Sequence, residues 1–255
     1  MTKISRRQLI ILAAPATLGA AIGMSHQDAL GNSVPTPIEK KMKIIVVGAH
    51  PDDPETASGG LMALYAAAGH DVISAYLTRG EAGIKDKSHE ESARIRTAEA
   101  LQACEILKVR PVFIGQIDGS CEITHEKYEA IYNLFNKEQP DIVLTHWPID
   151  THRDHRICSI LVYDAWLNLG RKSALYYFEC MSGQQSQNFA PTDYLDISGV
   201  IKQKHDACFI HKSQEIVEVY KTSHGPMEIF RGMEFGCEFA ESFVRHVQSP
   251  GIYLK

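Results

Sequence analysis

Residues 43–55, KIIVVGAHPDDPE, decide the expected fold, because an uninterrupted apolar run leads directly into imidazole and carboxylate groups. The run from Lys43 to Ala49 lacks polar–apolar alternation, which is typical of a strand buried on both faces of a parallel sheet. The residues that follow it are not the glycine-rich turn that a dinucleotide site needs. The stretch therefore predicts a buried strand that ends in reactive side chains.

The rest of the chain alternates strand-like and helix-like segments with short connections. We expect further strands at 71–78, 111–115 and 141–145, with others at 174–181 and 194–197. We expect helices at 58–69, 88–107, 126–137 and 153–169, and mostly helix over 199–243. This order predicts an α/β fold with a mostly parallel sheet, helices on both faces, and the active site at the carboxyl ends of the strands.

The start of the chain is typical of an export signal. Arg6 and Arg7 precede a mildly apolar stretch from Leu9 to Met24, as in a twin-arginine signal. An uncleaved N-terminal anchor is the alternative. We expect residues 1–40 to be signal peptide and linker, and 41–255 to be a single domain exported to the periplasm or the extracellular space.

Composition excludes several classes of protein. The 255 residues are 22% charged and 44% hydrophobic, with a formal net charge of −5 and no long basic run, so nucleic acid and anionic membranes are disfavoured as partners. We expect no stable membrane span in the mature chain. The six cysteines form no CxxC pair, and we expect most of them to be free thiols in the core.

Two clusters of imidazoles and carboxylates follow the first and fourth expected strands. Residues 50–55 read HPDDPE and residues 145–155 read THWPIDTHRDH. Each cluster has an ordinary structural explanation. Asp53 before Pro54 is compatible with a helix cap, Thr151 and Asp154 with a capping box, and His146 with a hydrogen-bonded histidine at a strand end. These explanations do not account for two such clusters on strand ends that face one crevice.

A zinc site accounts for both clusters together. Catalytic zinc takes three protein ligands, commonly imidazole and carboxylate, and keeps one position open for water. Fe²⁺ fits the same ligands. Asp52 and Asp53 are neighbours, so their side chains must diverge. One carboxylate can reach the metal while the other faces the substrate and takes a proton from the water.

Several segments resemble the LmbE-like, or PIG-L-type, N-acetylglucosaminyl deacetylases, and most of all their bacillithiol-pathway branch. The similar segments are AHPDDPETASGG at 49–60, LTRGEAG at 77–83, PDIVLTHWPIDTHRDHR at 140–156, HKSQ at 211–214 and RGMEFGCEFAESF at 231–243. The resemblance implies a Rossmann-like fold and zinc-dependent amide hydrolysis. It implies that His50, Asp53 and His155 bind the metal and that Asp52 is the general base.

The resemblance also implies roles for residues around the metal. His152 matches the residue that stabilises the oxyanion or protonates the leaving amine, and Asp154 the residue that orients it. Arg79 would lie near the substrate, or else hold its loop by a salt bridge. A second oxyanion donor is not assigned, although Tyr176 and Tyr220 are candidates.

The predicted activity is removal of the acetyl group from an N-acetylglucosamine-type substrate, a small-molecule amino sugar, with one Zn²⁺. The alternatives are an amidase with the same zinc chemistry, acting on a thiol conjugate or another amide, and a non-catalytic sugar-binding protein. A serine hydrolase is disfavoured because the sequence has no G-x-S-x-G motif.

Overall fold

A computed structural model of the chain describes residues 40–254. The predicted signal peptide and linker lie, apart from Lys40, outside these residues, so export stays a prediction. The strands are β1 (Lys43–Gly48), β2 (Asp71–Tyr76), β3 (Arg110–Phe113), β4 (Ile142–His146), β5 (Ala174–Phe178), β6 (Asp193–Asp196) and β7 (Ala240–Arg245). The α-helices are α1 (Asp53–Ala67), α2 (His89–Leu107), α3 (His125–Glu138), α4 (Arg153–Asn168), α5 (Ile201–Cys208), α6 (Ile216–Val219) and α7 (Gly225–Phe235). A 3₁₀ turn, η1 (Lys212–Gln214), and a π-helical turn, η2 (Tyr220–His224), flank α6.

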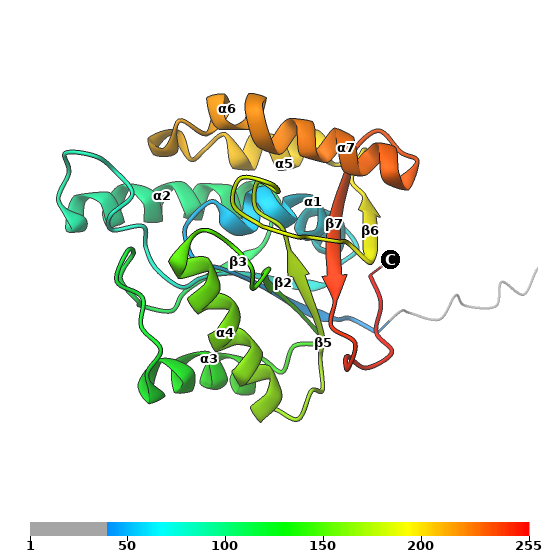
Figure 1. The fold of residues 1–255 in the computed structure, drawn as a ribbon, viewed down its shortest axis with the longest axis horizontal. Coiled ribbons are helices and arrows are strands. Elements are labelled where there is room, and N and C mark those ends of the chain that lie inside the picture. The colour runs from blue at the N-terminus through cyan, green and yellow to red at the C-terminus, as the bar shows by residue number, and fades with distance from the viewer. Residues whose placement is uncertain (1–39, 255) are drawn as a thin grey trace, which may run out of the picture. The chain divides into compact units, whose positions relative to one another are not determined.

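The strands form one sheet in the order β3-β2-β1-β4-β5-β7-β6 (Figure 1). Strands β1 to β5 pair in parallel, and β7 runs antiparallel to its neighbours β5 and β6. The predicted mostly parallel α/β sheet is therefore confirmed.

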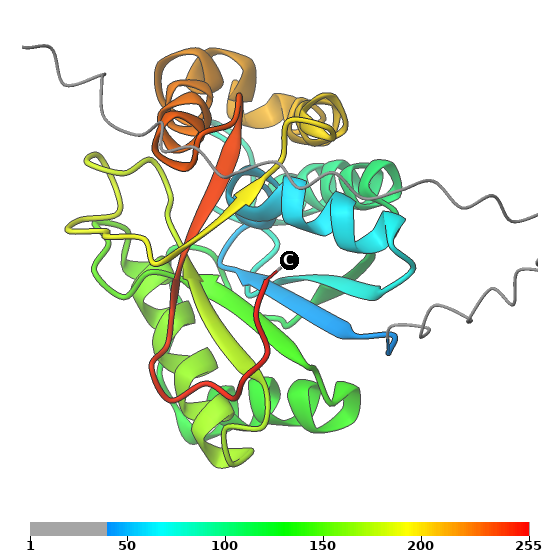
Figure 2. The same ribbon diagram turned by 90° about the vertical axis from the view of Figure 1, so that its right-hand side faces the viewer.

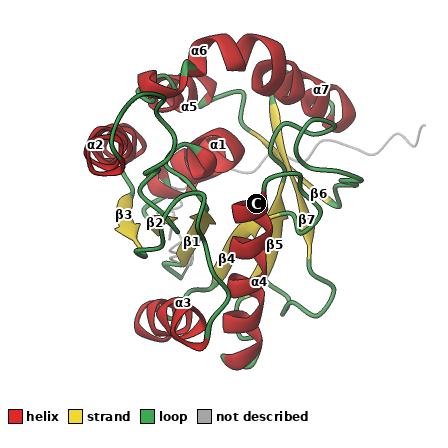
Figure 3. Ribbon diagram, turned by 60° about the vertical axis from the view of Figure 1, so that its left-hand side comes forward, coloured by secondary structure: helices red, strands yellow, loops and turns green. Residues whose placement is uncertain are grey.

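Helices cover both faces of the sheet (Figures 2 and 3). Along β1, Ile44 and Val46 pack in a core with residues of α1, α2 and α5. Ile45 and Val47 point the other way and pack with α3 and α4. Alternate residues of a strand face opposite sides of a sheet, so a strand buried on both sides must be apolar throughout.

The strand order reverses direction between β1 and β4. From β1 the chain builds outward through β2 to β3, and then returns to place β4 on the other side of β1. The loops that follow β1 and β4 leave to opposite faces and border a crevice. These are the two loops in which the sequence concentrates its imidazoles and carboxylates.

The first helix begins earlier than expected. Sequence analysis placed its start at Ser58, but α1 begins at Asp53. Pro54 suits the first helical turn because its fixed φ matches the helix and its missing N–H is not needed there. Ser58 instead marks a kink, with φ −143° and ψ 18°.

The expectation of mostly helix over 199–243 is wrong at its end. Gly236, with φ 93°, ends α7, and β7 follows as a strand between β5 and β6. The Glu241 carboxylate on β7 accepts hydrogen bonds from the amides of Gly60 (2.7 Å) and Leu61 (2.8 Å), just past the kink in α1. It also pairs with the buried Lys204 Nζ at 2.8 Å. These contacts join β7, α1 and α5.

The cysteine expectation is confirmed. All six are free thiols, buried except for the half-buried Cys237. Within residues 40–254, no helix is long and apolar enough to cross a membrane.

We predict that Glu241→Ala lowers the free energy of unfolding by about 2–4 kcal/mol, because it leaves two amides and part of a buried ammonium charge without an acceptor. Glu126→Ala, at a side chain that is 87% exposed, serves as the control and should change it by less than about 0.5 kcal/mol. Urea denaturation of both variants measures the difference. Equal stability would contradict the anchoring role of Glu241.

Candidate active site

The crevice between the β1 and β4 loops holds a cavity of about 470 Å³. Five of the residues singled out from the sequence line it, namely His50, Asp52, Asp53, His152 and His155. A sixth, Asp154, is fully buried and contacts His50. The structure thus brings together residues that lie about a hundred positions apart in the chain.

The Asp53 carboxylate is the centre of this group. Its Oδ2 lies 3.2 Å from His50 Nδ1 and 3.3 Å from His146 Nε2, and its Oδ1 lies 3.4 Å from His155 Nε2. The backbone amide of His50 also donates to Oδ2, at 2.7 Å. Asp53 is the first residue of α1, so the start of the helix places this carboxylate among the imidazoles.

The other ring nitrogens of the two predicted histidine ligands face further carboxylates. His155 Nδ1 lies 3.3 Å from Asp150 Oδ1. His50 Nε2 lies 3.1 Å from Asp118 Oδ1 and 3.5 Å from Asp154 Oδ2. A carboxylate behind a histidine is the usual arrangement around metal ligands, because it fixes the ring and raises its basicity.

Asp118 and Asp150 were given no role by the sequence analysis. Asp150 accepts hydrogen bonds from the His152 amide (2.8 Å) and Ser186 Oγ (3.1 Å), which hold it behind His155. Asp118 follows β3, so the rule that points to strand ends also points to it. Asp150 lies inside the loop that follows β4. The signal that could have identified both residues is their position after a strand of the sheet, because a single aspartate in a loop forms no recognisable motif.

The donor set fits a divalent cation. Ligand atoms of Asp53, His146, His155 and Cys180 lie within 4.8 Å of one another, and so do those of His50, His152 and His155. His146 Nε2 already accepts a hydrogen bond from the Ala49 amide, at 2.9 Å. Of the three ligands that the sequence predicts, His155 belongs to both groups, Asp53 to the first and His50 to the second. Imidazole and carboxylate suit zinc and Fe²⁺.

The cluster also stabilises positive charge. Burial lowers the pKa of His155, but the Asp53 charge and the hydrogen bond to Asp150 outweigh burial and raise that pKa to about 9. The same carboxylates that hold a proton on His155 attract a metal cation in its place.

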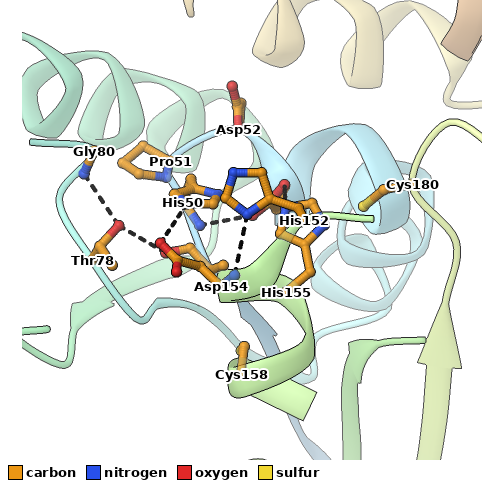
Figure 4. A network of polar contacts seen from close by, with 12 residues as sticks. His50, Pro51, Asp52, Thr78, Gly80, His152, Asp154, His155, Cys158 and Cys180 are labelled. Atoms are coloured by element: carbon orange, nitrogen blue, oxygen red, sulfur yellow. Dashed lines mark hydrogen bonds and ion pairs between the residues drawn. The ribbon is translucent and has the colours of Figure 1, made fainter. Parts of the chain in front are cut away.

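Asp52 diverges from Asp53, as the sequence requires. Its backbone has φ 114° and ψ −31°, a strained conformation for a residue other than glycine and one that clusters at functional sites. Figure 4 shows its side chain pointing away from the grouped imidazole rings. Arg96 Nη2 contacts Asp52 Oδ2 at 3.1 Å and also donates to the Pro51 carbonyl. Burial raises the pKa of Asp52 to about 6, and Arg96 opposes that rise.

His152 lies beside both predicted histidine ligands, with ring centroids 4.7 Å from His50 and 4.6 Å from His155. Its Nδ1 accepts a hydrogen bond from the Asp154 backbone amide, at 3.2 Å (Figure 4). The Asp154 carboxylate instead contacts His50 and accepts from the Gly119 amide, at 2.7 Å. Asp154 thus positions His152 through its backbone, while its side chain supports His50.

Arg79 is not placed with the site. Its exposed side chain donates to Thr97 Oγ1 at 3.1 Å, and it does not line the cavity. The arginine that lines the cavity is Arg96, which is only 3% exposed. Sequence reasoning passed over Arg96 because a charge within a long helix usually faces solvent. Gly80 and Gly83 have no Cβ atoms and so leave the space that the Arg96 side chain fills.

Neither candidate tyrosine lines the cavity. The Tyr176 hydroxyl donates to the Ile252 carbonyl at 3.4 Å, near the end of the chain. The Tyr220 hydroxyl donates to Glu228 at 2.6 Å. Both hydroxyls are therefore committed to structural contacts.

Residues 45–166, which include all the predicted metal ligands, match the PIG-L family model, described as GlcNAc-PI de-N-acetylase. This match spans a little under half of the chain. A curated relative from Corynebacterium diphtheriae, 1D-myo-inositol 2-acetamido-2-deoxy-alpha-D-glucopyranoside deacetylase, is 29% identical over 141 residues. The aligned region covers 44% of this chain and 48% of the relative, so the chain spans about half the length of the curated relative it matches.

Solved structures share the fold of the domain. N,N′-diacetylchitobiose deacetylase from Pyrococcus horikoshii is 23% identical, with a TM-score of 0.72 over 84% of this chain and 89% of that one. The 4-carboxy-2-hydroxymuconate hydratase from Pseudomonas putida is 21% identical, with a TM-score of 0.68 over 84% of this chain and 100% of that one. Two chemistries on one fold mean that function must be argued from the site.

We predict that Gly48→Ala disturbs the centre of the site. A Cβ at Gly48 would lie 2.8 Å from Asp53 Cβ and 2.6 Å from Pro54 Cδ, so the start of α1 must move. We expect the free energy of unfolding to fall by about 1–3 kcal/mol and Zn²⁺ binding in a titration to weaken. Gly199→Ala, where nothing lies within 4 Å, is the matched control and should change neither quantity. Identical behaviour of the two variants would contradict the tight packing behind Asp53.

Proposed function

We propose that this protein is a zinc-dependent N-deacetylase that hydrolyses the acetamide of an N-acetylglucosamine-type sugar. The observation that carries this proposal is the convergence of His50, Asp53 and His155 in one cavity, with Asp52 beside them and directed elsewhere. The names of the curated relative and of the Pyrococcus protein, which both describe deacetylases of acetamido sugars, support the choice of substrate.

His50, Asp53 and His155 would hold the metal. When bound, the cation polarises the amide carbonyl and lowers the pKa of a water molecule. The cavity, at about 470 Å³, is in the range of small-molecule sites. Gln185 and Gln214 also line it, and side-chain amides suit the hydroxyl groups of a sugar.

Asp52 would move the proton. Its carboxylate takes a proton from water as the water oxygen forms a bond to the acetamide carbon. The carbon–nitrogen bond then breaks, and Asp52 returns the proton to the departing amine. The products are acetate and a free amino sugar. Arg96 holds the Asp52 carboxylate through a 3.1 Å contact while this happens.

His152 would stabilise the oxygen that gains negative charge. Because its Nδ1 accepts a hydrogen bond from the Asp154 amide, the ring proton of the neutral form lies on Nε2. Burial lowers the pKa of His152, and His50 and His155 lower it further, which favours that neutral form. Nε2–H is then a donor for the oxyanion.

An amidase that acts on a thiol conjugate or another amide remains the main alternative, because it needs the same groups. Acetate release from a panel that contains N-acetylglucosamine, N,N′-diacetylchitobiose and simple N-acetylated thiols separates the two. A protein that binds zinc and sugar but releases no acetate from any of them would be a sugar-binding protein.

We predict that purified protein carries about one divalent ion per chain, and that His155→Ala and Asp53→Ala each lose most of it, because three ligands cannot spare one. His125→Ala, at an exposed position on α3, is the control and should keep the metal. Elemental analysis measures the content. Metal retained by both ligand variants would remove these residues from the site.

We predict that Asp52→Asn keeps the metal and the fold but loses about 10²–10⁴-fold in kcat for acetate release, the usual size of a general-base effect. Asp53→Asn, its neighbour, should instead lose the metal. If the two variants exchange these properties, the roles of the two aspartates are reversed.

A further inference from the structure

One cysteine lies at the edge of the predicted metal site. All six cysteines fall within the described residues, and Cys180, which is 2% exposed, is the one that lines the cavity. It follows β5, which pairs in parallel with β4, so it belongs to the same edge of the sheet as the two loops of the site. Figure 4 shows it on the far side of His152 and His155 from His50. A cation that enters the cavity therefore meets a thiol there.

Cys180 belongs to a donor set that differs from the predicted catalytic one. Its sulfur lies within 4.8 Å of ligand atoms of Asp53, His146 and His155. Asp53 Oδ1 and His155 Nε2 are 3.4 Å apart, close to the separation of two ligand atoms on a tetrahedral cation with bonds of about 2.0–2.1 Å. His50 is not part of this set. The cavity thus offers two overlapping cation positions that share Asp53 and His155.

His146 supports the sulfur and is not free to bind the cation. Its Nε2 accepts a hydrogen bond from the Ala49 amide at 2.9 Å, so the proton of the neutral ring lies on Nδ1. That Nδ1 lies 3.6 Å from Cys180 Sγ, where it is a donor to the sulfur. A hydrogen bond to sulfur favours the thiolate, which is the form of cysteine that binds metals.

The backbone holds Cys180 in place through one buried serine. The Cys180 amide donates to Ser186 Oγ at 2.9 Å, and the Ser186 amide donates to the Cys180 carbonyl at 3.0 Å. Ser186 Oγ also donates to Asp150 Oδ2 at 3.1 Å, and Asp150 lies behind His155. Ser186 therefore fixes both the thiol and the carboxylate that supports a shared ligand. Such outer contacts orient ligand atoms before a cation arrives.

The two positions cannot be filled together. His155 Nε2 has one lone pair and binds one cation at a time, because Nδ1 of the same ring faces Asp150. The position with His50 offers nitrogen and oxygen ligands, whereas the position with Cys180 adds a soft sulfur ligand. Soft ligands select thiophilic cations.

We propose that Asp53, His155 and Cys180 form a second cation position, which takes a thiophilic divalent ion such as Cd²⁺ and excludes zinc from the position beside His50. When the ion binds, the sulfur–hydrogen bond breaks, the proton passes to solvent and a sulfur–cation bond forms. This inference rests on the zinc site of the proposed function, and not on which acetylated sugar is the substrate.

The test adds Cd²⁺ to the purified, zinc-loaded protein. A sulfur-to-cadmium charge-transfer band should appear in the ultraviolet and saturate at about one ion per chain. Elemental analysis after gel filtration should show that Cd²⁺ has replaced the zinc. Cys180→Ser should lose the band and raise the Cd²⁺ concentration for half-replacement at least about tenfold, since even outer-shell substitutions cost that much. Cys237→Ser, at a half-buried thiol outside the cavity, is the matched control and should behave as the wild type.

Cys180→Ala guards against a misfolded serine variant, and thermal unfolding of the untreated proteins checks both. A wild type without the band, or a folded Cys180 variant that keeps it, would overturn the proposal. A band that forms while the zinc stays bound would overturn it too, because the two ions would not share Asp53 and His155. Protein that is purified without zinc but gives a band that depends on Cys180 would contradict the proposed function and leave the sulfur site standing.

Discussion

The buried carboxylate of Asp53 is the interaction on which the site depends. The imidazoles of His50 after β1, His146 at the end of β4 and His155 in α4 all have a ring nitrogen within 3.4 Å of one of its two oxygens. A buried carboxylate is costly unless positive charge and hydrogen bonds surround it. The same requirement makes the place where these imidazoles converge a place for a cation. Stability of the crevice and the proposed metal binding therefore depend on the same arrangement of charge.

Much of this arrangement follows from the sequence because it depends on strands. A strand buried on both faces is recognisable without a structure, and the loops after β1 and β4 must share a crevice once the strand order reverses between them. That reasoning is sufficient to bring His50 and Asp53 together with His155. It also requires Asp52 to point elsewhere, since neighbouring carboxylates in one place repel each other.

The parts that sequence reasoning missed depend on long-range packing. Glu241 accepts a hydrogen bond from Gly60, 181 positions away in the sequence. No local sequence pattern around Glu241 predicts a strand. In the sequence, Arg96 resembles an exposed residue of a helix. In the structure, its side chain packs against two glycines of another loop. The interpretation of Arg79 as a residue near the substrate came from the family resemblance of its loop, and in the structure its exposed side chain does not line the cavity. Spacing likewise shows that Asp154 is near His152, but not that its backbone amide rather than its carboxylate makes the contact.

The cavity has two walls of different electrostatic character. The strand-end loops form one wall, and the helical layer of α5, α6 and α7 contributes to the other. On one wall, carboxylates surround the imidazoles and raise the pKa of His155 to about 9. On the other, burial and the Lys204 ammonium lower the pKa of His224 to about 4. One wall therefore favours positive charge, and the other disfavours it. A hydratase shares this fold, so the sheet alone does not determine the chemistry. The residues that η2 and the strand-end loops place around the cavity decide which chemistry the fold performs.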